Sequence, residues 1–106
     1  MIIDTDGGID DAVALWWAVT DSSVEVVAVT VTWGNVPVEV ATASVRTVLA
    51  AAGRLDVPVV AGAESPCQPA PALRPATFVH GEDGLGNTGR TPPPDDAPIT
   101  DAPAYI

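Results

Sequence analysis

Four aspartates stand within eight residues near the start of the chain, in the run IIDTDGGIDDAVAL. They are Asp4, Asp6, Asp10 and Asp11. Carboxylates this close repel one another and raise one another's pKa, so a fold tolerates them when a cation neutralises the charge. Hard divalent cations prefer oxygen ligands of this kind. The spacing therefore indicates a metal site, and we expect the chemistry of the protein to lie here.

The residues around the cluster predict a strand, a turn and a helix. Residues 1–3 are apolar and are typical of the end of a short buried strand. In extended chain Asp4 and Asp6 project to one side. Gly7 and Gly8 permit a sharp turn, with positive φ if needed. A helix is predicted next, because apolar residues recur at three- and four-residue spacing at Ala12, Leu15, Trp16 and Val19.

Two of the aspartates have a simpler interpretation. Asp10 and Asp11 fall in the first turn of the predicted helix, where a carboxylate caps free N–H groups and complements the helix dipole. That interpretation does not account for Asp4 and Asp6, which precede the turn. The glycine turn is expected to fold both pairs of carboxylates toward one point.

The composition restricts the kind of protein and its partners. The chain has 106 residues, enough for one small domain, with a net charge of −10, four arginines and no lysine. This charge disfavours binding to nucleic acid or to anionic membranes. The only cysteine is Cys67, which fits a reducing compartment. No signal peptide or membrane-spanning run is visible, so we expect a cytoplasmic protein.

The rest of the pattern predicts an α/β fold with a parallel, Rossmann-like sheet. A strand is expected over Val24–Thr32, followed by a turn at Asn35 and a helix whose stop is Gly53. A third strand is expected over Val57–Ala61. Strand–helix–strand–helix–strand order indicates parallel strands with right-handed crossovers. At least one of the two tryptophans of the first helix, Trp16 and Trp17, is expected in the core.

The chain divides into residues 1–62, the βαβαβ core, and residues 63–106, which are rich in proline and glycine. The sequence 77–89 is expected to be a loop, with Glu82 and Asp83 as solvated acids. Residues 100–106 could begin a further helix, capped by Thr100. Three strands and two helices make half of a doubly wound sheet, so we expect residues 1–106 to be the N-terminal portion of a larger domain.

These segments resemble the inosine–uridine-preferring nucleoside hydrolases. DTDGGIDDAVAL is similar to that family's N-terminal signature, DTDPGxDDAxAL. VTVTWGNVPVEVATASVRTVL resembles its second strand, Gly–Asn turn and helix, GRLDVPVVAGAESP resembles its third strand, and VHGEDGLGNTG resembles its VHGxxGLG loop. Gly7 stands where the family has proline, a change expected to loosen the turn while preserving its direction.

The resemblance implies hydrolysis of the N-glycosidic bond of a ribonucleoside, assisted by Ca2+. It implies that Asp6 is a calcium ligand and the general base, and that Asp11 is a calcium ligand. Asp10, Asn35 and His80 would then contact the substrate. Asp4 would lie near the metal or orient one of its ligands. The family also implies a dimer or tetramer and further calcium ligands outside this chain.

Other functions are compatible with parts of the pattern. IIDTDGG also resembles the DxD motif of haloacid-dehalogenase-like phosphotransferases, in which the first aspartate is the nucleophile; Asp10 and Asp11 have no place in that motif. An EF-hand loop is excluded, because Leu15 stands where a bidentate acid is required. The isolated 106-residue chain could also be a non-catalytic fragment. The base preference, purine or pyrimidine, is not set by these residues.

Overall fold

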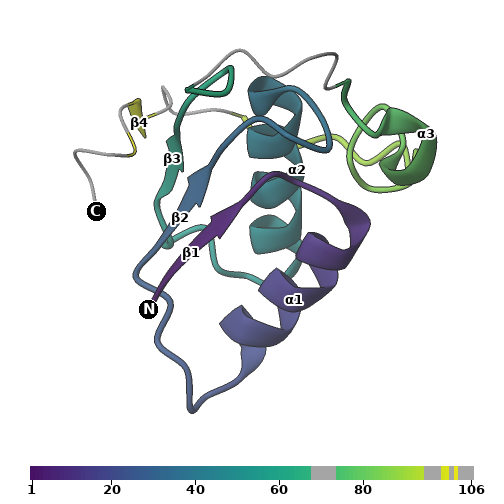
Figure 1. Ribbon diagram of the computed structural model, residues 1–106. Helices are drawn as coiled ribbons and strands as arrows, with labels where there is room; N and C mark the ends of the chain where they lie inside the picture. The colour runs from purple at the N-terminus through teal and green to yellow at the C-terminus, as the bar shows by residue number, and fades with distance from the viewer. Residues whose placement is uncertain (68–73, 95–98, 101, 103–106) are drawn as a thin grey trace.

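The computed structural model describes residues 1–67, 74–94, 99–100 and 102 (Figure 1). Its strands all run parallel in one sheet, in the order β1-β2-β3-β4. The strands are β1 (Ile2–Thr5), β2 (Ala28–Val31), β3 (Val59–Ala61) and β4 (Ile99–Thr100). The helices are α1 (Ile9–Thr20), α2 (Val38–Ala51) and the short α3 (Thr77–His80). The predicted βαβαβ order is confirmed.

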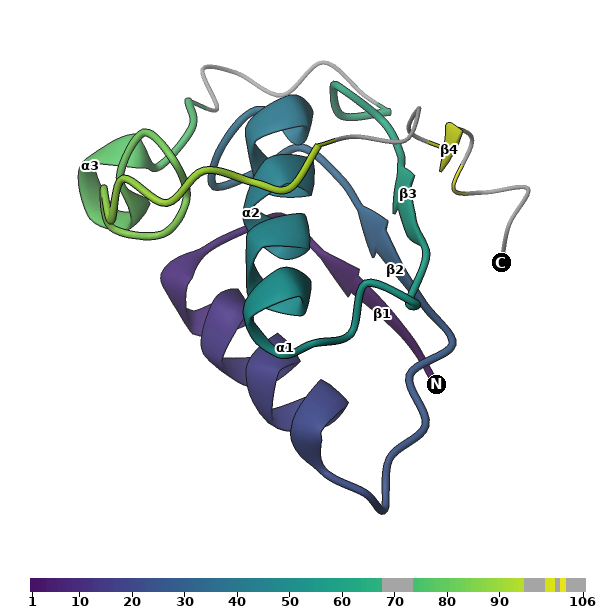
Figure 2. The same cartoon turned by 180° about the vertical axis from the view of Figure 1, so that it is seen from behind.

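Helices α1 and α2 lie side by side on one face of the sheet (Figures 1 and 2). Strands that follow one another in space as in sequence, joined by right-handed crossovers, place their helices on the same face. The core lies between the helices and β2, where Val29 and Val31 are fully buried. All four residues of β2 are buried, as expected for the central strand of a parallel sheet.

Helix α2 ends as the sequence predicts. Gly53 has φ +71°, a left-handed conformation that glycine adopts without steric cost. Its N–H donates to the carbonyl of Ala50, and the N–H of Arg54 donates to the carbonyl of Leu49. This pair of bonds is a Schellman motif, which satisfies carbonyls at the end of the helix. The chain then enters β3 after a short turn.

Several expectations about individual segments of the chain are corrected. Residues 77–80 form the short helix α3 instead of a loop. Thr100 belongs to β4, where backbone pairing with β3 outweighs its potential as a helix cap; most of the helix expected over 100–106 lies outside the described residues. Trp16 and Trp17 are 45% and 64% exposed, so neither is in the core.

No helix among the described residues is long and apolar enough to cross a membrane. Helix α1 has 12 residues and begins with two acids in its first turn. Helix α2 has 14 residues and is buried along much of its length by the sheet and by α1. Both helices are therefore of the length typical of globular proteins.

The turn after β1 depends on Gly7. Its φ is +72°, and a Cβ built there would lie 2.5 Å from the Cβ of Ala41 on α2. The N–H of Gly7 donates to the hydroxyl of Thr5, which is buried. Proline cannot adopt a positive φ, so glycine here is not a neutral replacement for the proline of the family signature. The expectation that glycine loosens the turn while preserving its direction stays a prediction.

We predict that Gly7→Ala lowers the free energy of unfolding more than Gly53→Ala does. Both substitutions place alanine at a positive φ, at a cost of about 1–2 kcal/mol. Only Gly7→Ala also forces a methyl group against Ala41, which adds about 1–3 kcal/mol of overpacking; no atom lies within 4 Å of a Cβ at Gly53. Urea unfolding of the two variants measures the difference. Equal losses would show that α2 does not press on the turn.

Candidate active site

Asp6 is held where the first two strands end. The carboxyl ends of parallel strands meet at one edge of a sheet, which brings the residue after β1 close to the turn after β2. The backbone N–H of Asn35 donates to Asp6 Oδ2 at 3.1 Å, and Asn35 Nδ2 donates to Asp6 Oδ1 at 3.0 Å. A Cβ at Gly34 would lie 2.1 Å from Asp6 Oδ2, so this approach requires glycine.

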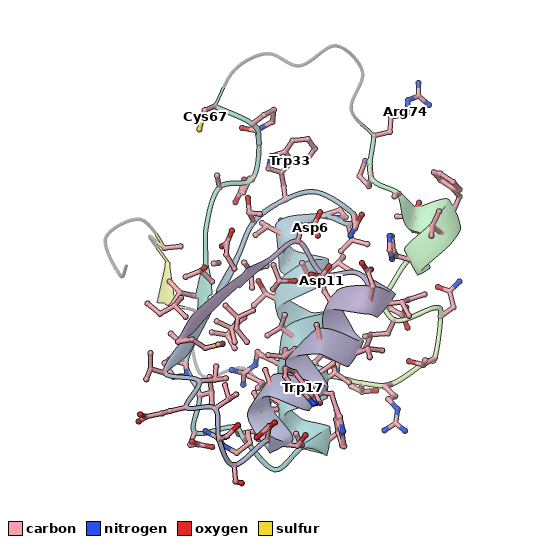
Figure 3. All side chains as sticks on the ribbon, turned by 60° about the horizontal axis from the view of Figure 1, so that its bottom comes forward. Asp6, Asp11, Trp17, Trp33, Cys67 and Arg74 are labelled. Atoms are coloured by element: carbon pink, nitrogen blue, oxygen red, sulfur yellow. The ribbon has the colours of Figure 1, made fainter. Side chains whose placement is uncertain are left out.

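Asp11 lies beside Asp6 at the start of α1 (Figure 3). It is the third residue of the helix, and its Oδ2 accepts the N–H of Gly8 at 3.0 Å. Gly8 stands at the N-cap and has no side chain, so only this half of a capping box exists. The carboxylate of Asp11 therefore both caps the start of α1 and lies next to Asp6.

The environment of Asp6 raises the pKa of its carboxyl group above the usual value. Burial is the largest cause, because it disfavours the charged form. The adjacent Asp11 carboxylate adds to the shift, while the N–H of Asn35 opposes it. Two neighbouring carboxylates, one partly desolvated, form a site that a cation would stabilise.

Three polar side chains lie close to Gly8, the residue whose N–H binds Asp11. A Cβ built on Gly8 would lie 2.7 Å from Asn35 Nδ2, 2.8 Å from Asp10 Oδ1 and 2.9 Å from His80 Cε1. The structure thus brings together Asp10, Asn35 and His80, which come from α1, the turn after β2 and the end of α3. Asp10 is 84% exposed, so the carboxylate faces solvent.

His80 is attached to the start of α1. Its Nδ1 accepts the backbone N–H of Ile9 at 3.1 Å, one of the helix's free first-turn donors. Nδ1 also lies 3.8 Å from Asp10 Oδ1. Because the lone pair of Nδ1 is already used by Ile9, Nδ1 has no proton for Asp10, and the two atoms are not an ion pair. The neutral ring then has its proton on Nε2.

Asp4 has a different surrounding. It is exposed on β1, and its carboxylate accepts a hydrogen bond from the hydroxyl of Thr30, its register partner on β2. Its place as a metal ligand stays a prediction. Within the described part of the chain, no group of three or more His, Cys, Asp or Glu side chains is arranged to hold a metal ion. Asp6 and Asp11 therefore supply two carboxylates, and calcium, which takes six to eight oxygen ligands, needs others.

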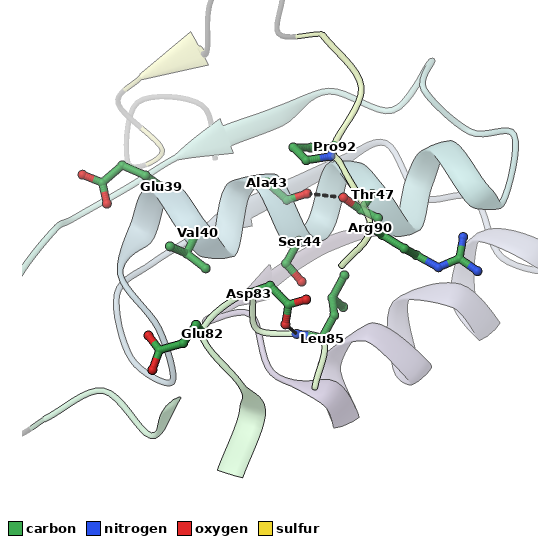
Figure 4. A pocket seen from close by; sticks show the side chains of 10 residues that line it. All are labelled: Glu39, Val40, Ala43, Ser44, Thr47, Glu82, Asp83, Leu85, Arg90 and Pro92. Carbon is green, nitrogen blue, oxygen red and sulfur yellow. Dashed lines mark hydrogen bonds between the residues drawn. The ribbon is translucent and has the colours of Figure 1, made fainter. Parts of the chain in front are cut away.

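Two of the larger cavities among the described residues lie beside this region. One, of about 300 Å³, separates α2 from the loop after α3 and is lined in part by Glu39, Ser44 and Asp83 (Figure 4). The other, of about 310 Å³, is an apolar groove between α1 and α2 that Trp16 and Leu85 help to line. Neither is lined by the side chains that surround Gly8.

Sequence reasoning missed the role of the 81–89 loop. Asp83 is half-buried, and its Oδ1 accepts the N–H groups of Leu85 and Asn87, both at 2.8 Å. The expectation that Asp83 is only a solvated acid is therefore wrong. The glycines of the loop were the available signal, since four of them have positive φ, at Gly81, Gly84, Gly86 and Gly89.

A parallel sheet with acidic residues and an asparagine at its carboxyl edge defines a small-molecule site of the α/β class. The family model of the inosine-uridine preferring nucleoside hydrolases matches residues 1–106. The chain belongs to this family.

The relatives agree with this family. The chain is 46% identical over 99 residues to the "Probable uridine nucleosidase 2" of Arabidopsis thaliana, covering 93% of this chain and 30% of that protein. It is 40% identical over 92 residues to the "Inosine-uridine preferring nucleoside hydrolase" of Leishmania major, covering 87% and 29%. A solved plant nucleoside hydrolase superposes with a TM-score of 0.82 at 45% identity, covering 92% and 30%. The chain thus spans about 30% of the length of these relatives.

We predict that Asp11→Asn lowers the pKa of Asp6 and that Asp10→Asn does not. Asp11 is a cause of the raised value, whereas Asp10 is not among the groups that shift it. A folded pKa above the unfolded one means that stability is lost as pH rises through the folded value. Without a bound cation, Asp11→Asn should therefore lose less stability over that pH range.

Carboxyl carbon NMR titration of Asp6 in the two variants measures this effect directly. Asp10→Asn is the matched control, because it removes the same charge one residue away. An equal shift in both variants would mean that the overall negative charge of the region, and not the Asp6–Asp11 contact, sets the pKa of Asp6.

Proposed function

We propose that this chain is part of a longer protein that hydrolyses the N-glycosidic bond of ribonucleosides, releasing ribose and the free base. The observation that carries the proposal is the Asp6 carboxylate, fixed by two hydrogen bonds from Asn35 and raised in pKa beside Asp11. Family membership supports the reaction class. The differing names of the relatives give no single base, so uridine and inosine are both candidates.

Asp6 would act as the general base. In the reaction, water adds to the anomeric carbon, the C–N bond breaks, and the departing base takes up a proton. Burial and the Asp11 carboxylate raise the pKa of Asp6 when no cation is bound, and calcium on Asp6 would lower it again, so the role as base rests on the position of the carboxylate. The bonds from Asn35 fix the direction of the carboxylate, so that the oxygen does not rotate away from the water.

Calcium would be held by Asp6 and Asp11. The fit rests on two adjacent carboxylates whose repulsion a divalent cation would remove. When bound, calcium supplies an electrostatic attraction that favours ionised water and fixes sugar hydroxyls. Asp4 is kept as a metal-proximal or orienting residue. Because the described residues provide only two such carboxylates together, we also propose that the isolated 106-residue chain binds calcium weakly and is inactive.

The ribose would lie over Gly8. Asp10 is exposed and ionisable, and can accept hydrogen bonds from sugar hydroxyls. Asn35 donates its backbone N–H and one N–H of its side-chain amide to Asp6, and its Oδ1 would accept a hydrogen bond from a ribose hydroxyl. His80 would donate a hydrogen bond to the ribose from Nε2–H. A cytoplasmic, dimeric or tetrameric enzyme of nucleoside salvage remains our expectation.

The phosphotransferase alternative is not favoured, because the nucleoside hydrolase model matches the whole chain. The two reactions are separated by one assay. We expect release of base from inosine or uridine and no release of phosphate from phosphomonoesters. An acid-labile aspartyl phosphate on Asp4 would overturn the proposed function in favour of phosphoryl transfer.

Within that assay, Asp6→Asn should reduce kcat by about 100- to 10,000-fold, the usual loss for a general base. The amide oxygen can still ligate a cation and accept one hydrogen bond from Asn35, but it cannot take up a proton at neutral pH. Ribose binding should therefore change less than turnover. A variant that retains more than about a tenth of the activity would place the base elsewhere.

For the metal, Asp11→Ala should weaken calcium binding by about tenfold or more, because it removes a directly bound negative charge. Asp10→Ala is the matched control and should retain calcium affinity, since Asp10 points toward ribose in the proposal. Isothermal titration calorimetry with calcium compares the two. Unchanged affinity in Asp11→Ala would remove this residue from the metal site.

A further inference from the structure

The loop that follows His80 is fastened to itself by side chains. Asp83 Oδ1 accepts two backbone N–H groups, from Leu85 and Asn87, both at 2.8 Å. Asn87 Oδ1 in turn accepts the N–H of Glu82 at 2.8 Å. Figure 4 shows the carboxylate of Asp83 turned toward the backbone of Leu85. These bonds cross the loop in both directions, so its conformation does not depend on neighbouring elements alone.

The electrostatics of Asp83 agree with this role. Burial raises the pKa of the Asp83 carboxyl group, but the backbone N–H groups of Leu85 and Asn87 outweigh it, and the net pKa is lowered. A carboxylate that accepts several backbone N–H groups is a stronger acceptor than a neutral side chain. The ionised form of Asp83 is therefore the form that binds the N–H groups of Leu85 and Asn87.

The loop of residues 81–89 packs against the turn that contains Gly7. A Cβ at Gly84 would lie 2.8 Å from the carbonyl oxygen of Gly7, so the loop backbone touches the turn that connects β1 to α1. The N–H of Gly86 donates to the carbonyl of His80 at 2.8 Å, which joins the loop to the end of α3. His80 is therefore fixed at both its backbone and its ring.

We propose that Asp83 is a positioning residue that keeps His80 on the N–H of Ile9, so that the imidazole presents Nε2–H to the substrate beside Asp10. The proposal rests on the proposed function for the identity of the substrate, a ribonucleoside. Asp83 touches neither reactant. It acts by holding the loop whose Gly86 N–H binds the carbonyl of His80, and this keeps Nδ1 of His80 in place to accept the N–H of Ile9.

The tautomer of His80 provides a readout that does not depend on activity. Nitrogen NMR of the wild-type protein should show an unprotonated Nδ1 and a protonated Nε2 in the His80 ring. The two ring signals are identified by their loss in His80→Gln. In Asp83→Ala the two ring nitrogens should approach the mixture of tautomers found in free histidine. Glu82→Ala, the adjacent exposed acid, is the matched control and should keep the wild-type pattern.

Kinetics test the same claim in the reaction. Asp83→Ala should raise KM for the nucleoside by about tenfold, as expected when a fixed hydrogen-bond donor is lost, and lower kcat less. Asp83→Asn should restore most of the loss, because its Oδ1 can still accept both N–H groups. In His80→Ala, adding Asp83→Ala should change KM no further, since residues that act through one another are not additive.

The outcomes separate the two proposals. If wild-type protein releases no base while Asp83→Ala still scrambles the tautomer, the proposed function fails and the positioning of His80 stands. If the enzyme is active and Asp83→Ala keeps both tautomer and KM, the positioning role is overturned. Should Asp83→Ala not fold, Asp83→Ser keeps a small polar side chain, and its shorter hydroxyl should lose at least one of the two N–H bonds that Asp83 accepts from Leu85 and Asn87. An unchanged tautomer in a folded Asp83→Ser would equally contradict the proposal.

Discussion

The arrangement of this chain depends on keeping the carboxylate of Asp6 in place next to that of Asp11. Two like charges in contact, one partly desolvated, separate unless the surrounding backbone prevents it. Here the prevention comes from two sides. Asn35 binds both oxygens of Asp6 from the end of β2, and the N–H of Gly8 binds Asp11 at the start of α1. The sheet and the first helix thus hold one acid each.

Small residues make that contact geometrically accessible. Gly34 leaves room for Asp6, and Gly8 leaves the space around which three polar side chains gather. Gly7 turns the chain while lying against α2. Each of these glycines is required by a close approach, not by flexibility. The proposed site is therefore bounded by side chains from separate elements, which gather over the backbone at Gly8.

Much of this was accessible from the sequence because the signals are local. The aspartate run, the glycine turn and the alternating strands and helices all lie within short windows of the chain. The part that could not be predicted is non-local. Nothing near His80 indicates that its ring binds Ile9, and nothing near Asp4 shows that its partner is Thr30. Asp83 was misjudged for a local reason: its partners are backbone groups of its own loop, and only the glycines of the loop indicate such a turn.

A crystal structure of the protein that contains this chain, grown with calcium and ribose, tests the central claim most directly. The account predicts one calcium ion in contact with carboxylate oxygens of both Asp6 and Asp11. It also predicts the ribose over Gly8, between Asp10, Asn35 and His80. A calcium ion bound away from the Asp6–Asp11 pair, or a ribose seated in the groove between α1 and α2, would contradict it.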